Sequence, residues 1–388
     1  MSEEQLKRRA AVFRNNFLPY SETFIHDELR FHHRYETVVM ARRKMNADRF
    51  EGHNVVAVET IPEPRNRAAS LFYAATTRSR LIQSAVANGG FDIIHAHFGH
   101  NGIYALGFAE RNRLPLVVSL HGGDVTTLIS KEKYKPGWWN YLTRYKRMFR
   151  TADLFLAASQ EMKTLIESVG CPPEKVVVFR LGIDLDTFVP APEKRRTDPP
   201  LVVMTGRFVP KKGHELGIRA FAQALKQGVS AELVIIGDGL LKSRYLSLIG
   251  ELSICDSVKL AGVLPPSAVK ETIQSSSVVL APSIVAPNLD RESGMIVAKE
   301  ASACGVPVIG HIHGGIPDII EDGKTGYLVR EGDVDKMSAH LCSVLTNESL
   351  RVALGEAARR KMEREYNIRD RILALEEIYD SIVASHRR

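Results

Sequence analysis

The chain has 388 residues, of which 44% are hydrophobic and 25% charged, and its formal net charge is +7. This composition is typical of a globular protein, and the length favours two domains over a single core. No stretch approaches the about 18 apolar residues of a membrane span, and the charged, polar first residues predict no secretory signal. Four cysteines lie far apart without a CxxC pair, which indicates a reduced cytoplasmic protein and argues against structural zinc.

The positive charge is concentrated in the first half of the chain. Residues 1–187 hold 26 basic and 20 acidic side chains, whereas residues 188–388 hold 26 and 25. This asymmetry suggests an anionic partner, such as a phospholipid surface on the inner face of the cell membrane or a phosphorylated acceptor. Nucleic acid would match the charge, but the sequence has no zinc-finger, RNP or helix-turn-helix pattern, so we expect no nucleic-acid partner.

Short apolar runs of strand length alternate with helical patterns along the first half. Two of the helical patterns span 70–87 and 102–111. Strands that alternate with helices form a parallel sheet covered by helices on both faces, and ligands bind outside the carboxyl ends of its strands. The predicted strands are 11–14, 37–41, 55–58, 93–96, 116–119, 154–158 and 176–179.

A proline-rich, charged linker at 189–200 separates this half from a second series of strands. The series comprises 201–205, 232–236, 258–260, 278–281, 306–310 and 326–329, and a helical segment follows from 335 to 385. We therefore expect an α/β chain of two doubly wound, Rossmann-like domains that face each other across a functional cleft. The expected domains are 1–188 and 201–365, with a C-terminal helix at 366–388 that packs back on the first domain.

The stretch 279–305 carries the most informative pattern. An apolar strand that ends at Pro282 is followed by a polar loop and then by a helix from about Gly294 to Ala303. The helix start would offer free N–H groups and the positive end of a helix dipole to a phosphate. Glu300 would lie roughly 9 Å along the axis from the helix start, where its carboxylate could accept hydrogen bonds from both hydroxyls of a ribose. Glu292 lies in the loop before the helix.

A second basic motif follows the strand 201–205. Arg207 comes directly after Gly206, and Lys212 follows five residues later. The guanidinium can bind a phosphate through two hydrogen bonds, and the ammonium adds a point charge. The alternative is a solvated basic turn without a ligand.

The order of these motifs resembles that of the family-four retaining glycosyltransferases, which have the GT-B fold. The family resemblance covers nearly the whole chain. It is greatest for members that act on exopolysaccharides or lipid-linked oligosaccharides. The motifs are Ile94-His95-Ala96-His97-Phe98, His121-Gly122-Gly123-Asp124, Leu181-Gly182-Ile183-Asp184 with Phe188, Gly206-Arg207 with Lys212-Gly213, Ile236-Gly237-Asp238-Gly239, Glu292 with Glu300, and Gly314-Gly315-Ile316-Pro317-Asp318 with Gly323 and Gly326.

The resemblance implies a role for each matching residue. Arg207 and Lys212 would neutralise the donor diphosphate, Glu292 would bind hydroxyls of the transferred sugar, and His121 would face that sugar; these four form the expected catalytic set. Glu300 would bind the ribose. The other expected donor-binding residues are Gly237, Gly239, Val263, Leu264, Ser293, Gly294, Met295 and Ile296. Of these, Val263 and Leu264 would touch the base, and the N–H groups around Gly294, Met295 and Ile296 would cradle the distal phosphate.

The resemblance also implies an acceptor side in the first half. The loop 16–23 is similar to that of exopolysaccharide transferases, and Ser21 could cap the helix after it. The expected acceptor-side residues are Tyr20, Ser21, Glu22, His97, His121, Gly122 and Asp124. The chain departs from the family pattern at Ser293-Gly294-Met295, where Gly-Phe-Gly is frequent, and at Lys299, where an apolar residue is common.

The implied reaction is the retaining, metal-independent transfer of a hexose from a nucleotide-diphosphate sugar, UDP rather than GDP, to a glycan, lipid-linked or small hydroxylated acceptor. No cofactor is expected, and the chain lacks an Asp-x-Asp pair with an evident metal role. The pairs His95/His97 and His311/His313 each place two rings on one side of a strand. Because no third ligand is spaced to match, we predict no metal site and a structural or hydrogen-bonding role for both pairs.

Several alternatives remain open from the sequence. A sugar-nucleotide 2-epimerase of the same architecture and a nucleotide-sugar-binding scaffold without turnover are both possible, whereas a dehydrogenase is disfavoured because GxGxxG is missing. Residues 131–150 interleave Lys and Arg with aromatic residues. They could anchor the enzyme at a lipid surface, or form an amphipathic helix that packs Trp139, Leu142 and Phe149 inward.

Overall fold

The computed structural model describes residues 7–19, 22–46, 50–191 and 197–387. The chain forms two compact units, one of residues 1–182 with 368–388 and one of residues 183–367, and each is described by itself. Tyr20 and Ser21 of the expected acceptor side lie outside the described residues. The domain boundaries expected at 188, 200 and 365 stay predictions.

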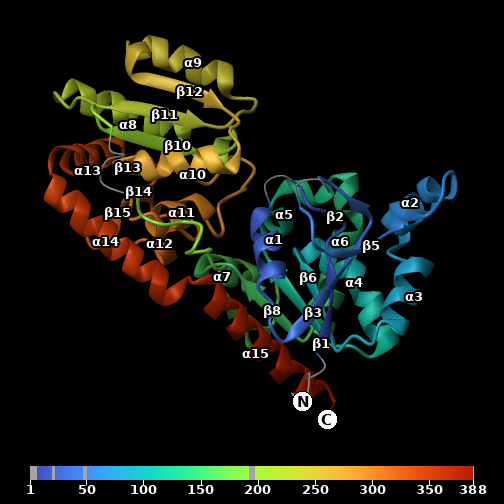
Figure 1. Cartoon of the computed structure of the whole chain (residues 1–388). Helices are drawn as coiled ribbons and strands as arrows, with labels where there is room; N and C mark the ends of the chain where they lie inside the picture. The colour runs from blue at the N-terminus through green and yellow to red at the C-terminus, as the bar shows by residue number, and fades with distance from the viewer. Residues whose placement is uncertain (1–6, 20–21, 47–49, 192–196, 388) are drawn as a thin grey trace. The chain divides into compact units, whose positions relative to one another are not determined.

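A parallel sheet of seven strands forms the centre of the first unit, in the order β5-β3-β1-β6-β7-β8-β9 (Figure 1). On one side of the sheet the strands follow one another in chain order from β1 to β3 and β5, and on the other side from β6 to β9. The direction of strand order therefore reverses between β1 and β6. The seven strands predicted from the sequence are confirmed. They are β1 (Arg8–Phe13), β3 (Tyr35–Ala41), β5 (Asn54–Ala57), β6 (Ile93–His97), β7 (Leu116–Leu120), β8 (Leu154–Ala157) and β9 (Val176–Val178), and β2 (Asn16–Phe17) pairs separately with β4 (Arg43–Lys44).

Helices cover this sheet, and one sequence prediction about them is wrong. The single helix expected over 70–87 is two helices, because Thr77 adopts a left-handed conformation (φ 62°) that ends the first, while Ser79 caps the second by accepting from the Ile82 N–H. The helices are α1 (Thr23–Arg30), α2 (Arg65–Thr76), α3 (Arg80–Asn88), α4 (Gly99–Asn112), α5 (Gly123–Ile129), α6 (Trp139–Thr151), α7 (Gln160–Ser168) and α15 (Ile368–His386), with 3₁₀ turns at Val58–Thr60, Lys131–Tyr134, Pro136–Trp138 and Pro173–Lys175.

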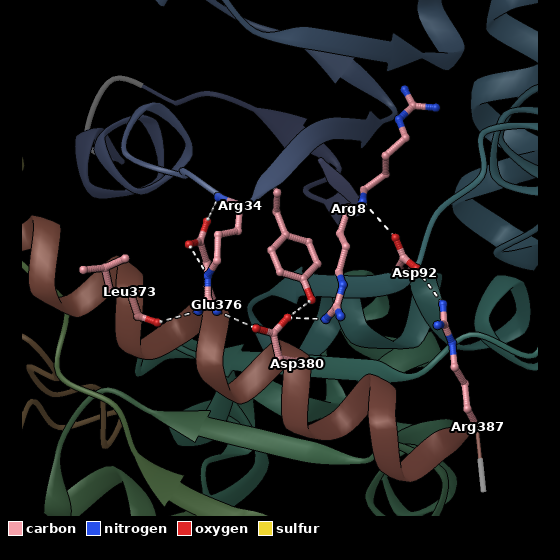
Figure 2. Close-up of polar contacts among 9 residues, drawn as sticks. Arg8, Arg34, Asp92, Leu373, Glu376, Asp380 and Arg387 are labelled. Carbon is pink, nitrogen blue, oxygen red and sulfur yellow. Dashed lines mark hydrogen bonds and ion pairs between the residues drawn. The ribbon is translucent and has the colours of Figure 1, made fainter. Parts of the chain in front are cut away.

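Helix α15 belongs to the first unit although it is the last segment of the chain. Its inward residues Ile372, Leu375 and Tyr379 join a buried cluster with strand residues such as Ala10 and Val117. Polar contacts surround this apolar seam, as Figure 2 shows for Glu376 and Asp380. The helix is therefore held by apolar burial and by specific hydrogen bonds.

Glu376 makes the most extensive of these polar contacts. One of its carboxylate oxygens accepts from the backbone N–H groups of His33 (2.8 Å) and Arg34 (3.0 Å) and lies 3.1 Å from His32 Nδ1. Figure 2 shows Arg34 beside this carboxylate. Nearby, Asp380 accepts from the Tyr35 hydroxyl at 2.8 Å and from Arg34 at 2.7 Å. These bonds tie α15 to the segment between α1 and β3.

The second unit is built on a parallel sheet of six strands in the order β12-β11-β10-β13-β14-β15 (Figure 1). The strands are β10 (Leu201–Thr205), β11 (Glu232–Ile236), β12 (Val258–Gly262), β13 (Val278–Ala281), β14 (Val308–His311) and β15 (Gly326–Val329), and all six predicted strands are confirmed. The helices are α8 (His214–Lys226), α9 (Lys242–Glu251), α10 (Pro266–Ser275), α11 (Ile296–Ala303), α12 (Ile316–Ile319), α13 (Val334–Thr346) and α14 (Glu348–Glu365), with 3₁₀ turns at Pro210–Lys212 and Cys255–Ser257.

Two apolar clusters cover the two faces of this sheet. One packs Met204, Ile235 and Leu280 against α8 and α13, and the other packs Val203, Val279 and α11. The strand order reverses between β10 and β13, and ligands of doubly wound sheets bind at such a reversal. No helix among the described residues combines the length and the apolar character that crossing a membrane requires.

The contacts of Glu376 predict a pH-dependent contribution to stability. Burial alone would raise the pKa of this carboxyl, but the hydrogen bonds from His32 and from two backbone N–H groups lower it from 4.5 to about 2. A carboxylate whose pKa is lower in the folded state stabilises the fold above its unfolded pKa, and this contribution is lost as the pH falls from 4.5 towards 2. We expect Glu376→Gln to lower the free energy of unfolding by about 1.5–3 kcal/mol at pH 7, and by less at pH 4.

Urea denaturation of the full chain measures this difference. The matched control is Glu377→Gln, which removes the same charge from the exposed neighbour on α15. Equal losses for the two variants would contradict the role assigned to Glu376.

Candidate functional site

Two loops meet at the strand-order reversal of the second unit. The first follows β10, where Pro210 begins a 3₁₀ turn that holds Lys211 and Lys212 and that ends at Gly213 with φ 61°. The second follows β13. A Cβ on Gly213 would lie 1.8 Å from the Pro282 carbonyl oxygen, so only glycine allows this approach. The packing brings the two lysines next to the loop that carries Glu292.

Glu292 forms an ion pair with these lysines. Its Oε1 lies 3.1 Å from Lys212 Nζ and 3.8 Å from Lys211 Nζ, and Lys211 also lies 3.1 Å from Asp290. Burial raises the pKa of Glu292, but the two ammonium groups outweigh it and the net pKa is lowered. The carboxylate is therefore ionised at neutral pH and is available as a hydrogen-bond acceptor.

The His311/His313 pair positions the same loop. The Nε2 atom of His313 accepts from the Glu292 N–H at 3.1 Å. The ring proton therefore lies on Nδ1, which donates to Glu331 at 2.6 Å. The buried ring of His311 lies 3.1 Å from the Ser283 carbonyl oxygen, to which its Nδ1–H donates. These contacts show the hydrogen-bonding role predicted for this pair. Gly314 completes the arrangement, since a Cβ there would lie 2.2 Å from the Glu292 carbonyl oxygen.

Helix α11 follows this loop. It begins at Ile296, with Met295 as its N-cap, two residues later than the sequence predicts. Glu300 lies on the second turn, so its distance from the helix start is about 6 Å along the axis rather than 9 Å. Lys299 is buried with its ammonium 5.8 Å from the centre of the Tyr366 ring, a cation–π contact that explains a lysine at this apolar position.

The remaining expected donor-binding residues lie at the carboxyl ends of β10, β11 and β12. Arg207 is exposed. Gly237 and Gly239 have φ of 143° and 153°, and Cβ atoms there would lie 2.0 Å from the Gly206 oxygen and 2.8 Å from the Phe208 oxygen. Close packing of two loops thus requires both glycines. Val263 is 65% exposed, whereas Leu264 packs against the core.

In the first unit, His97 and His121 lie at the ends of the neighbouring strands β6 and β7. His97 Nδ1 is 3.1 Å from His121 Nε2, and the two rings stack with centroids 5.4 Å apart. The buried Asp124 carboxylate accepts from the Gly99 N–H at 2.7 Å and from the His121 N–H at 3.2 Å. Asp124 therefore ties the two loops together, and burial raises its pKa.

Glu28 is a residue of this cluster that the sequence analysis missed. Its Oε1 lies 3.3 Å from His97 Nε2 and 3.6 Å from His95 Nδ1, and the three ligand atoms lie within 4.8 Å of one another, a spacing that a metal ion could bridge. The prediction that His95 and His97 lack a third candidate ligand is thus wrong. The signal was present, because Ile25, Glu28 and Leu29 follow the spacing of the buried face of α1.

Hydrogen bonds within the protein satisfy both nitrogens of His95. Its Nδ1 lies 2.6 Å from the Tyr379 hydroxyl, and its Nε2 lies 2.8 Å from Ser119 Oγ. A ring bonded in this way has no free lone pair for a metal ion. We therefore interpret the cluster as a hydrogen-bonded network.

Comparisons with known proteins show the family of this chain. The family described as Glycosyltransferase Family 4 matches residues 25–187, and the one described as Glycosyl transferases group 1 matches residues 187–361. The putative colanic acid biosynthesis glycosyltransferase WcaL of Escherichia coli K12 is 32% identical over 304 residues, which cover 76% of this chain and 73% of that protein. The chain belongs to the family-four glycosyltransferases.

Two further similarities support the fold and the activity of this family-four glycosyltransferase. The amylovoran biosynthesis glycosyltransferase AmsK of Erwinia amylovora is 31% identical, over 76% of this chain and 72% of that protein. The crystal structure of Anabaena Alr3699/HepE in complex with UDP has a TM-score of 0.76 at 19% identity, over 96% of this chain and 100% of that one. The predicted GT-B fold and the predicted glycosyltransferase activity are confirmed, while the individual roles of the site residues stay predictions.

Glu22, expected from the sequence on the acceptor side, lies at the N-cap of α1 in this family-four glycosyltransferase. Its carboxylate accepts from Arg14 Nε at 2.7 Å, and Arg14 in turn lies 4.7 Å from the centre of the Phe98 ring. Because Arg14 is buried, this pair links the end of β1 to the start of α1. Gly122 has φ of 107°, which glycine adopts without strain, at the turn between His121 and α5.

The aromatic–basic segment 131–150 contains two 3₁₀ turns and helix α6. Tyr141, Met148 and Phe149 are buried, so one face of α6 packs inward. Trp139 is 67% exposed and Tyr134 is 70% exposed. The expectation that Trp139 packs inward is therefore wrong.

Proposed function

We propose that this glycosyltransferase moves a hexose from a UDP-sugar to a hydroxyl of a glycan or lipid-linked acceptor during synthesis of a cell-surface or exported polysaccharide. The observation that carries the proposal is the ion pair between Lys212 and Glu292 at the strand-order reversal. The relatives WcaL and AmsK, named for colanic acid and amylovoran biosynthesis, support the acceptor class. The UDP complex of the structural neighbour is the reason for placing UDP first among donor nucleotides.

The donor diphosphate is proposed to bind between Arg207, Lys212 and the loop 293–296 before α11. Arg207 supplies a forked donor, and Lys212 a positive charge whose partner before binding is Glu292. In the complex the Glu292 carboxylate accepts hydrogen bonds from sugar hydroxyls. Glu300 accepts from the ribose, Val263 and Leu264 contact the base, and Gly237 and Gly239 keep the neighbouring loop close.

The chemistry follows from where charge develops. As the bond between the anomeric carbon and the diphosphate oxygen breaks, negative charge grows on the diphosphate, and preorganised cations stabilise it most in the transition state. The acceptor hydroxyl attacks the anomeric carbon on the face that the diphosphate leaves, and its proton passes to a phosphate oxygen. Configuration is thereby retained. In this proposal Arg207 and Lys212 replace a metal ion, no cofactor takes part, and His121 contacts the sugar.

We further propose that the exposed part of segment 131–150 contacts anionic membrane lipids. Trp139 and Tyr134 expose apolar rings, and Lys146 and Arg147 on α6 are exposed as well. Rings and cations of this kind settle together at a lipid–water interface. Such a contact would keep the enzyme near a lipid-linked acceptor.

A thermal-unfolding panel tests the donor. We expect a UDP-sugar, but not GDP- or ADP-sugars, to stabilise the protein by about 2.7 kcal/mol at a concentration 100 times its dissociation constant. Arg207→Ala and Glu300→Ala should abolish this stabilisation, because each removes a proposed donor contact. Arg219→Ala, an exposed arginine on α8, is the matched control and should keep it. Absence of stabilisation by every nucleotide sugar would contradict the proposed function.

The reaction type is tested on a donor and acceptor pair that turns over. Excess EDTA should leave the rate unchanged, because two fixed side-chain cations carry out the charge neutralisation. The anomeric coupling constant of the product, measured by NMR, should match that of the donor sugar. A rate that falls in EDTA and recovers with a divalent ion, or an inverted product, would contradict the mechanism.

Vesicle flotation tests the membrane contact. The enzyme should float with vesicles that contain phosphatidylglycerol and not with neutral phosphatidylcholine, and Trp139→Ala combined with Lys146→Glu should abolish flotation. The matched control, Leu246→Ala with Lys242→Glu, changes an exposed apolar residue and a lysine on α9. Equal flotation of wild type and both variants would show that segment 131–150 is not the contact.

A further inference from the structure

Glu28 is a buried carboxylate in the interior of the first unit, and no step proposed above uses it. Its side chain is 5% exposed, and the histidines beside it, His95 and His97, are fully buried. An isolated carboxylate costs several kcal/mol to bury, so such groups are paired or hydrogen-bonded in folded proteins. Its partner with the shortest contact is His97, whose Nε2 lies 3.3 Å from Glu28 Oε1.

His97 connects this carboxylate to His121. The ring of His97 has Nε2 next to Glu28 and Nδ1 next to His121, whose Nε2 lies 3.1 Å away. Stacking of the two rings and the contacts of Phe24 and Phe98 with His121 limit the rotation of the second ring. Three titratable groups thus form one line from the core to the carboxyl end of β7.

We propose that Glu28 is a positioning residue for glycosyl transfer, which holds a proton on Nε2 of His97 and thereby sets the tautomer of His121. This inference rests on the proposed contact of His121 with the sugar. It concerns which nitrogen of His121 carries the proton.

The proton positions follow from donor and acceptor counts. An ionised carboxylate only accepts, so the nitrogen that faces it carries a proton. A His97 ring that carries its one proton on Nε2 has a lone pair on Nδ1, and His121 then donates from Nε2. Neutral His121 with its proton on Nε2 has Nδ1 as an acceptor atom. In this proposal the Nδ1 lone pair accepts a hydrogen bond from a hydroxyl of the transferred sugar.

The surroundings of Glu28 and His121 agree with the protonation states that this inference requires of these two groups. Burial alone would raise the pKa of Glu28, but His97 and His95 lower it to about 2, so the carboxylate is ionised at neutral pH. Burial lowers the pKa of His121 well below 6.5 and that of His95 to about 3, so both rings are neutral. His95 lies beside the line rather than in it, since Tyr379 and Ser119 hold its two nitrogens.

The first measurement is made on the wild-type protein by ¹⁵N NMR of the histidine rings. The chemical shifts of the two nitrogens distinguish a protonated from an unprotonated atom, and they need no substrate. We expect the Nε2–H tautomer for both His97 and His121. A His121 ring that carries its proton on Nδ1 would overturn the inference even if no variant folds.

Glu28→Gln then tests whether the carboxylate is the cause. The amide keeps the shape but removes the charge, so the ¹⁵N pattern of His121 should change and kcat should fall about 10- to 100-fold, the range of a lost charged hydrogen bond. UDP affinity, measured by calorimetry, should stay unchanged, because Glu28 lies in a different compact unit from the proposed UDP contacts. If the wild-type enzyme itself does not bind UDP, that result contradicts the proposed function and not the role of Glu28.

Two controls separate positioning from general stability. Glu376→Gln removes another buried carboxylate of the same unit, which contacts His32, the backbone and the Arg34 side chain but not His97, and it should leave the tautomer and kcat unchanged. His97→Gln should lower kcat as Glu28→Gln does, and the double variant should lose no more than either single one, because both act on His121 along one route. Additive losses, an unchanged tautomer in Glu28→Gln, or one equivalent of zinc in the purified enzyme would overturn the inference.

Discussion

The reversal of strand order in the six-stranded sheet is the constraint on which the donor half depends. Chain order leads outward from β10 on one side and from β13 on the other, so the loops after these two strands lie side by side at one edge of the sheet. Gly213 lets the loops touch, and the contact brings Lys212 within 3.1 Å of Glu292. Residues separated by eighty positions become one charged site through the topology of the sheet.

Two buried carboxylates of the seven-stranded unit, Glu376 and Glu28, have different surroundings. Glu376 receives hydrogen bonds from the backbone and from a neighbouring histidine, and it joins α15 to the sheet. Glu28 lies beside the rings of His95 and His97, on the line that leads to His121. The contacts of Glu376 hold helix α15 on the sheet. The contacts of Glu28, in our proposal, determine which nitrogen of His121 carries the proton.

Local patterns predicted the elements of this fold well and their exact limits less well. All thirteen strands of the two large sheets follow apolar runs, because strands buried on both faces of a parallel sheet are continuously apolar. The prediction failed at Thr77, where a left-handed residue divides α2 from α3, and at Trp139, which α6 exposes although the helical spacing favours burial. The break at Thr77 comes from a left-handed backbone that apolar periodicity does not report. The exposure of Trp139 depends on which neighbours cover it, and a local pattern contains no information on them.

The sequence by itself determined the two parallel α/β units, the family to which the chain belongs, and the residue types of the donor loops, because each depends on periodicity or on motif order along the chain. The tertiary structure decided that Lys212 pairs with Glu292, that His313 holds the Glu292 backbone, and that Glu28 joins His95 and His97. These contacts connect positions far apart in the chain. Only packing of the folded backbone brings them within hydrogen-bonding distance, so no pattern of neighbouring residues could have revealed them.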